Sequence, residues 1–220
     1  MPTSRSLATS DEIRAYLIDQ LNLALRRPGV FGNELALRML MDHLLFVERQ
    51  PEALAEQQRV WEERGAWSST GVAGVFRDQI PDRYYEYGIA SVYAEFAHRR
   101  GWLKPDRVLN PAEYAVLQGA VRQWAGEDRV WTDVVDKFGT PSMLFGSNNR
   151  FYGKTLGYLT ENPEEPMVSF HLWSGSAPGA EQSWPPEHEE PLLLAVRFGT
   201  GLFGQTFTFT PEGRRRLPVE

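Results

Sequence analysis

The glycine spacing Gly199-x-Gly201-x-x-Gly204 follows an apolar run and has the pattern of a loop that cradles phosphate groups. In a dinucleotide-binding loop the third glycine opens a helix, because the helix N-terminus receives the pyrophosphate. Here Gly204 instead opens the alternating segment QTFTFT, which is typical of a strand. We therefore expect a turn between two strands, in which glycine supplies a positive φ, and no nucleotide or other cofactor.

Other residue types that ligate metals or transfer protons occur without the partners such sites need. Glu95-x-x-His98 is half of a di-iron carboxylate motif, but the sequence has no second copy, and the position of Glu95 four residues before Arg99 favours a surface ion pair. A Ser–His–Asp triad drawn from Ser169 or Ser142, His171, and Asp133 or Asp136 lacks a nucleophile-elbow motif. We predict no metal site and no catalytic residue.

The segment MVSFHLW carries the most informative group. Ser169, His171 and Trp173 alternate with the apolar residues Val168, Phe170 and Leu172. In a sheet with one covered face, a His and a Trp on the open face indicate a contact surface or a pocket wall. Residues of neighbouring segments are predicted to line the same place: Lys154, Tyr158 and Asn149. The alternative is that helices or a long loop cover both faces, which makes these residues part of the core.

Acidic residues gather in two loops between the predicted strands: Glu161, Glu164, Glu165, Glu181, Glu187, Glu189 and Glu190. Acidic loops beside an aromatic surface attract and hold a basic protein partner. Glu187 and Glu189 are therefore included in the candidate binding site. The alternative interpretation is that these side chains serve solubility alone.

Composition excludes several classes of function. The chain of 220 residues contains no cysteine, which removes disulfides, thiolate metal sites and cysteine nucleophiles. Its net charge of −6 lacks the basic footprint of a nucleic-acid-binding protein. Neither an apolar signal region nor a run of membrane-spanning length occurs, so the sequence predicts a cytoplasmic protein with no membrane partner.

The elements that position these residues change character along the chain. Residues 1–139 show helical spacing of apolar residues, with helix starts at Thr9-x-x-Glu12 and Asn110-Pro111. Residues 140–220 show five short segments with alternating or continuous apolar residues, separated by turn residues. We predict one α+β domain over residues 1–220, with an N-terminal helical half packed on a C-terminal, mainly antiparallel sheet of about five strands.

The stretch LRRPGVFGNELALRMLMDHL, residues 25–44, resembles an RPGMY-type segment of small bacterial proteins described as toxin-immunity proteins. Arg27, Pro28 and Gly29 match that pattern, while Val30 and Phe31 replace Met and Tyr. The stretches SVYAEFAHRRGWL and FGTPSMLFGSNNRFYGKTLGYLT are similar to segments of uncharacterised actinobacterial proteins. The resemblance covers roughly a third of the chain and implies no catalytic residue.

Two functions follow as expectations. The first is a non-catalytic, cytoplasmic protein-binding factor of an immunity or regulatory kind, whose partner is a basic protein. The alternative is a small-molecule-binding protein or enzyme with a pocket between the helices and the sheet. The sequence leaves the oligomeric state open.

Overall fold

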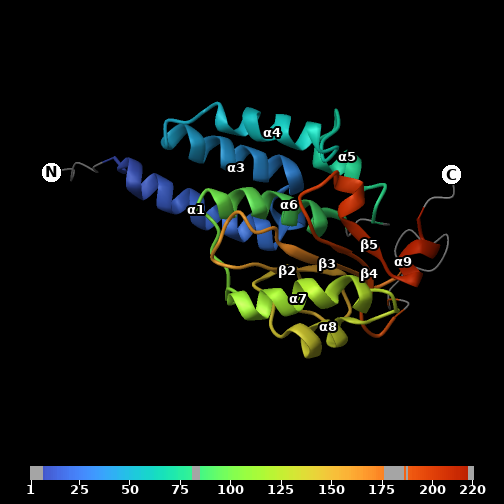
Figure 1. Ribbon diagram of the computed structural model, residues 1–220. Helices are drawn as coiled ribbons and strands as arrows, with labels where there is room; N and C mark the ends of the chain where they lie inside the picture. Colours follow the sequence, from blue (N-terminus) through green and yellow to red (C-terminus); the bar gives the residue numbers. More distant parts are fainter. Residues whose placement is uncertain (1–6, 81–84, 176–185, 187, 218–220) are drawn as a thin grey trace.

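The computed structural model describes residues 7–80, 85–175, 186 and 188–217. Eight helices precede the first strand, and a short 3-10 helix, a last strand and a ninth helix complete the described part of the chain (Figure 1). In chain order the elements are α1 (Ser10–Arg26), α2 (Pro28–Phe31), α3 (Asn33–Val47), α4 (Ala53–Glu63), α5 (Val72–Phe76), α6 (Tyr85–Arg99), α7 (Pro111–Trp124), α8 (Trp131–Phe138), β1 (Met143–Gly146), β2 (Lys154–Tyr158), β3 (Val168–Trp173), β4 (Leu192–Arg197), η1 (Phe203–Thr206), β5 (Phe207–Phe209) and α9 (Pro211–Arg215).

The five strands form one antiparallel sheet in the order β1-β2-β3-β4-β5. Each strand pairs with the next one along the chain, so short turns and loops suffice to connect them. The α+β class, the helical first half and the antiparallel C-terminal sheet are as predicted from the sequence.

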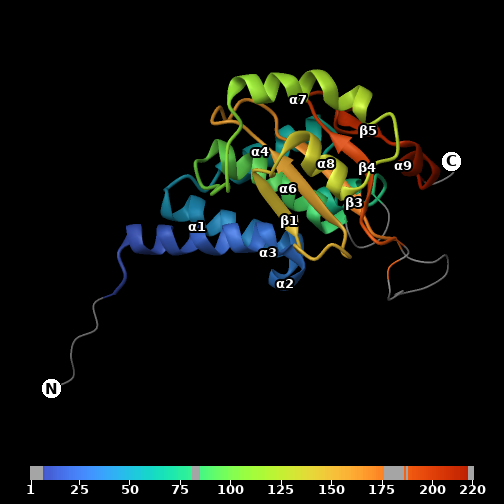
Figure 2. The same ribbon diagram turned by 90° about the horizontal axis from the view of Figure 1, so that it is seen from below.

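Helices cover both faces of the sheet. Helix α6 packs on one face together with α1, and α3 and α4 lie farther out in the same layer (Figure 1). Helices α7 and α8 cover the opposite face, and α8 lies in front of the strands when the molecule is seen from below (Figure 2). The sheet thus separates two apolar cores, one against each helical layer.

The expectation of a sheet with one open face is therefore wrong. All six residues of β3 are buried, including Ser169, His171 and Trp173. The alternation of polar and apolar residues reflects two different cores, because the face of Val168, Phe170 and Leu172 packs under α7 and α8. The opposite face packs against the layer that contains α6 and α5.

Two helix starts follow directly from local hydrogen bonding. Thr9 and Glu12 form a capping box at the start of α1, and Asn110 and Glu113 form another at α7. In α7 the Glu113 amide donates to Asn110 Oδ1 at 3.0 Å, and the Asn110 amide donates to Glu113 Oε2 at 2.8 Å. Each box satisfies backbone donors that the helix itself leaves unpaired.

The glycine segment after β4 is a connection within a hairpin, as predicted. Gly199 has a φ of 123°, a conformation that favours glycine, and β4 pairs antiparallel with β5. The chain makes one turn of 3-10 helix before β5, so the strand is shorter than the alternating sequence indicates. Among the described helices, no segment is long and apolar enough to cross a membrane.

Candidate functional site

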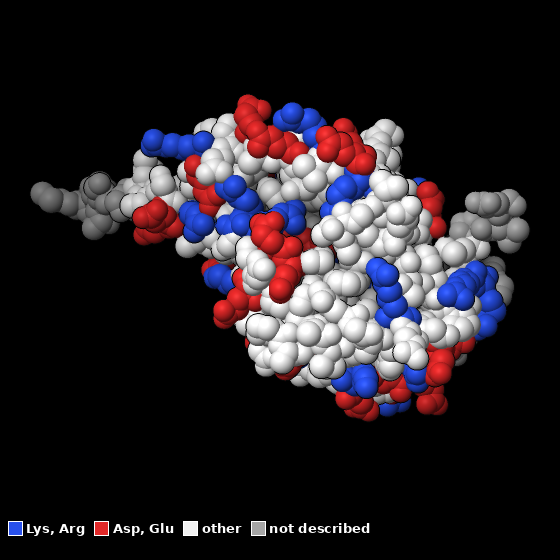
Figure 3. Space-filling view, in the orientation of Figure 1, with Lys and Arg blue, Asp and Glu red and all other residues white. Residues whose placement is uncertain are grey.

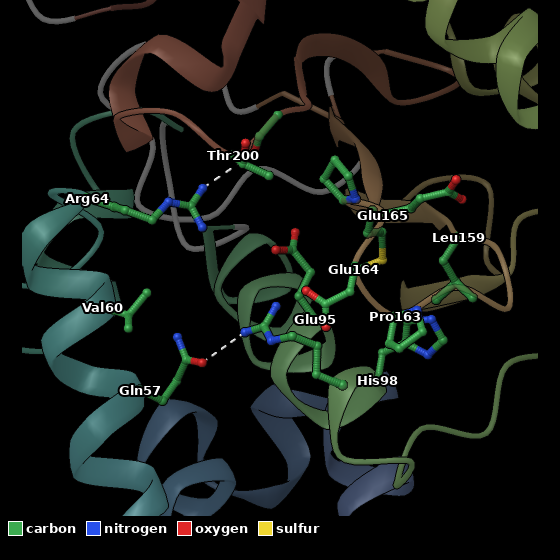
Figure 4. Close-up of a pocket in the computed structure, with 14 residues that line it drawn as sticks. Gln57, Val60, Arg64, Glu95, His98, Leu159, Pro163, Glu164, Glu165 and Thr200 are labelled. Atoms are coloured by element: carbon green, nitrogen blue, oxygen red, sulfur yellow. Dashed lines mark hydrogen bonds between the residues drawn. The ribbon is translucent and has the colours of Figure 1, made fainter.

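A cleft of about 300 Å³ opens between α4, α6 and two loops of the sheet. We call it the α4–α6 cleft. Its walls come from four segments far apart in sequence: Gln57, Val60 and Arg64 at α4, Glu95, His98 and Arg99 on α6, Leu159 and residues 163–167 of the β2–β3 loop, and Gly199 and Thr200 after β4. Figure 4 shows Gln57, Val60 and Arg64 on one side, Leu159 and Pro163 on the other, and Glu95 and Glu164 between them.

A buried ion pair lies beside this cleft. Arg197 Nη2 is 2.7 Å from Glu95 Oε1, and both side chains are largely shielded from solvent. The same nitrogen donates to Ser91 Oγ at 3.2 Å and to Ser169 Oγ at 3.3 Å. The pair joins α6 to β4, and the two hydroxyl groups offset part of the cost of burying the guanidinium group.

The ion pair expected between Glu95 and Arg99 is not formed, because the Glu95 carboxylate turns to Arg197. Arg99 is exposed at the cleft and donates instead to Gln57 Oε1 at 2.9 Å, a neutral partner. The charge of Arg99 therefore has no carboxylate partner among the described residues.

Arg64 connects two walls of the cleft by hydrogen bonds. Its guanidinium group donates to the carbonyl oxygens of Gly201 at 3.2 Å and Gly199 at 3.4 Å, and its own carbonyl accepts from the Phe203 amide at 2.7 Å. Burial lowers the pKa of Arg64. These bonds fasten the β4–β5 connection to the end of α4 and hold two walls of the cleft together.

The β2–β3 loop forms an acidic wall with internal bracing. The Thr160 hydroxyl donates to Glu165 Oε2 at 2.5 Å, and the Glu164 amide donates to Asn162 Oδ1 at 3.1 Å. The Glu164 side chain is exposed and makes no ion pair within the described residues. In the space-filling view, acidic and basic side chains meet near the centre of this face of the molecule (Figure 3).

His98 of α6 also lines the cleft. Burial lowers the pKa of His98 below its usual value, and a hydrogen bond to the Thr160 backbone acts in the opposite direction. Its Nε2 atom is buried and has no hydrogen-bond partner among the described residues.

His171 and Ser169, two of the predicted site residues, lie in the core. His171 is 2% exposed, its Nδ1 is 3.0 Å from Thr155 Oγ1, and its ring packs between Phe76 and Phe207. Burial, with the charge of Arg197 as a further cause, lowers the pKa of His171 well below its usual value. Neither side chain reaches the protein surface.

Trp173 is also buried, with 3% of its surface exposed, and Arg216 covers its ring at 3.7 Å from the centroid. Glu189 is exposed in the connection before β4. Glu187 lies outside the described residues. The expected arrangement of an exposed tryptophan with an acidic rim is thus not present at Trp173.

The strand residues Lys154 and Tyr158 lie on the other side of the sheet from His171. The pairing of Lys154 with Leu172 and of Tyr158 with Val168 places their side chains on the α7–α8 face, because cross-strand neighbours share a face. The prediction that they line one place with His171 is therefore wrong. Tyr158 donates to the Gly139 carbonyl oxygen at 2.8 Å and belongs to the α7–α8 core.

Lys154 and Asn149 are brought together. The Lys154 ammonium group donates to the Asn149 carbonyl oxygen at 2.9 Å and lies 3.6 Å from the centre of the Trp131 ring. Burial lowers the pKa of Lys154 to about 8, and the negative charge of Glu190 acts against that shift. The Asn149 side chain is exposed and accepts a hydrogen bond from the Phe151 amide.

The residues of the α4–α6 cleft were missed as a group because no spacing joins them. The sequence pattern marks Glu95 and His98 only as half of a metal motif. The described residues contain no cluster of three or more His, Asp or Glu side chains able to hold a metal ion. No protein-family model, curated protein or solved structure matches the chain.

Proposed function

We propose that the protein is a non-catalytic binding protein and that a small charged ligand occupies the α4–α6 cleft. The observation that supports this proposal is a pair of opposite charges on different walls of the cleft, Arg99 on α6 and Glu164 on the β2–β3 loop, which form no ion pair with each other. Leu159, Met167 and Val60 supply apolar surface in the same cleft. A concave site with apolar lining and a few polar groups is the usual form of a small-molecule site.

The charges favour a ligand that carries both an anionic and a cationic group. Arg99 offers guanidinium donors to a carboxylate or phosphate, and Glu164 accepts from an ammonium group. Arg197 already neutralises Glu95. The Glu95 carboxylate therefore contributes polar surface to the cleft and no uncompensated charge.

Native mass spectrometry of the gently purified protein tests this proposal. We expect a bound small molecule that is released on unfolding, and its loss from Arg99→Gln and from Glu164→Gln. Arg122→Gln is a matched control, because Arg122 is an exposed arginine on α7, away from the cleft. Absence of any adduct, together with unchanged melting temperatures in the presence of a panel of amino acids and small zwitterions, would contradict it.

A second candidate function is binding of a basic protein, as an immunity or regulatory factor. It is favoured by the exposed acidic residues Glu161 and Glu164, which lie on one loop at the surface. Charges at the rim of an interface act mainly on the association rate. Glu161→Lys combined with Glu164→Lys is expected to slow association with a partner recovered by affinity purification, and to weaken its salt dependence.

The two candidates separate cleanly in these experiments. A small-molecule site is lost with Arg99→Gln, which removes a positive charge from the cleft. A site for a basic protein is strengthened or unchanged by Arg99→Gln, because the surface becomes more negative.

A further inference from the structure

The outer face of α3 carries an unusual row of exposed apolar side chains. Leu35, Met39 and Phe46 expose 65%, 52% and 75% of their surface. With Asp42 they occupy positions 35, 39, 42 and 46, a 4-3-4 spacing that keeps all four side chains on one side of a helix. The opposite side of α3 is buried through Leu37, Met41 and Leu44.

That spacing is the seam pattern of two helices packed together, with Leu35 and Asp42 at one heptad position and Met39 and Phe46 at the other. Nothing in the described part of the chain covers the seam. Helix α3 is held in place by α1 and α4 in the helical layer (Figure 1), so a partner helix would meet a helix that is already formed. Association therefore loses no conformational entropy in forming that helix.

We infer that this face binds a second copy of the same chain through antiparallel packing of α3 on α3. A two-fold axis midway along residues 35–46 pairs each surface with itself, as an isologous interface requires. Leu35 then faces Phe46 of the second copy, and Met39 faces Asp42. The pairing buries the three exposed apolar side chains of each copy.

Charge complementarity favours this register. Asp42 is exposed and makes no ion pair within the described residues, and in the antiparallel arrangement it lies beside Arg38 of the second copy. Arg38 is held near this face by its own contact with the Trp67 ring, whose centroid is 5.0 Å from the guanidinium carbon. A parallel arrangement brings each Asp42 against the other and is disfavoured by like-charge repulsion.

A groove beside the seam offers room for Phe46, the largest side chain of the seam. It measures about 380 Å³ and is lined by Leu35 and Met39 of α3 with Pro51 and Leu54 at α4. The antiparallel register places Phe46 of the second copy over Leu35, at this groove. Phe46 is therefore the expected anchor of the interface, in keeping with the dominance of aromatic side chains at such positions.

Sedimentation velocity of the full chain over a wide range of concentrations tests the inference. We expect a monomer–dimer equilibrium, and a dissociation constant raised at least about tenfold by Phe46→Gln. Val116→Gln is the matched control, because Val116 is 65% exposed on α7 and its replacement should leave the equilibrium unchanged. A monomer at every concentration, or a dimer indifferent to Phe46→Gln, overturns the inference.

Charge exchange tests the register. Arg38→Asp alone and Asp42→Arg alone should each weaken self-association, since each places like charges together across the axis. Mixing the two single variants should restore association, because every 38–42 contact in the mixed dimer joins opposite charges. If the mixture associates no better than either variant, the antiparallel pairing is wrong. Should Arg38→Asp lower the melting temperature, Asp42→Arg and Phe46→Gln still decide whether this face is the interface.

Discussion

The Tyr93 hydroxyl donates a hydrogen bond of 2.6 Å to Glu34 Oε1, deep in the helical layer. The same carboxylate accepts from the Val72 amide at 2.8 Å and the Ala73 amide at 2.9 Å, so it also caps the start of α5. One glutamate of α3 thereby joins α5 and α6, the two elements that pack against the His171 side of the sheet. Burial, with the charge of Glu34 as a further cause, raises the pKa of Tyr93, which remains a donor at every physiological pH.

Tyr93→Phe is expected to lower the free energy of unfolding by roughly 1.5–3 kcal/mol, the range for a hydrogen bond to a charged group. Urea denaturation measures the change. Tyr16→Phe is the control, because Tyr16 is exposed on α1 and its hydroxyl is accessible to water. Equal stability of Tyr93→Phe and the parent protein would show that this bond contributes nothing net.

Breaking the Glu95–Arg197 pair should be much more costly than removing the neighbouring exposed charge. Arg197→Met is expected to lower the free energy of unfolding by about 3–5 kcal/mol, because it leaves the Glu95 carboxylate poorly compensated in a shielded place. Arg99→Gln should change it by less than about 0.5 kcal/mol, since Arg99 is at the surface. Similar effects of the two variants would mean that Glu95 uses Arg99 as much as Arg197.

Lys154 should make stability rise with pH in the alkaline range. Its pKa in the folded protein is about 8, below the value of about 10.4 of an unfolded chain, so the unfolded state binds more protons between these limits. The free energy of unfolding should therefore increase as pH rises through this window, relative to Lys154→Met. Denaturation of both proteins between about pH 8 and pH 10 checks the sign, and a parallel course of the two curves would contradict it.

His171 should make the free energy of unfolding fall as pH decreases in the acid range. Burial keeps the folded imidazole neutral, whereas the unfolded imidazole takes up a proton below about pH 6.5. Stability is thus complete above that pH and is lost as pH falls, with a slope of up to about 1.4 kcal/mol per pH unit from this one group. Replacement by Leu should reduce the slope.

His43→Gln is the control for this measurement. His43 is exposed on α3, where its imidazole is open to water in the folded and the unfolded state alike. The acid slope of His43→Gln is the reference with which that of His171→Leu is compared. An equal slope in the parent and in His171→Leu would show that His171 is protonated as easily in the folded protein as in the unfolded chain.

Local signals in the sequence determine the elements of this protein. Thr9 with Glu12, and Asn110 with Glu113, start helices by hydrogen bonds that span three residues. The alternation around Phe170 and the glycine at 199 likewise place a strand and a turn. These features are predictable because propensity, capping and turn geometry depend on neighbours in the chain.

Only the tertiary structure decided what each face of the sheet meets. Alternation separates Val168 and Phe170 from Ser169 and His171, but it does not state whether the second face meets water or another helical layer. The second layer is supplied by α6 and its neighbours, which all end by Arg99, whereas β3 begins only at Val168. Pattern within a strand carries no information about a covering element so far away.

The same reason separates Glu95 from its predicted partner. The i,i+4 neighbour Arg99 is visible in the sequence, whereas Arg197 lies on β4 and reaches Glu95 only when α6 packs on the sheet. Burial then strengthens the longer-range pair, because charges shielded from water interact more strongly than charges at the surface. The α4–α6 cleft likewise forms only when these elements pack together. Its lining residues come from segments far apart in the sequence, and no helical or strand periodicity connects those segments.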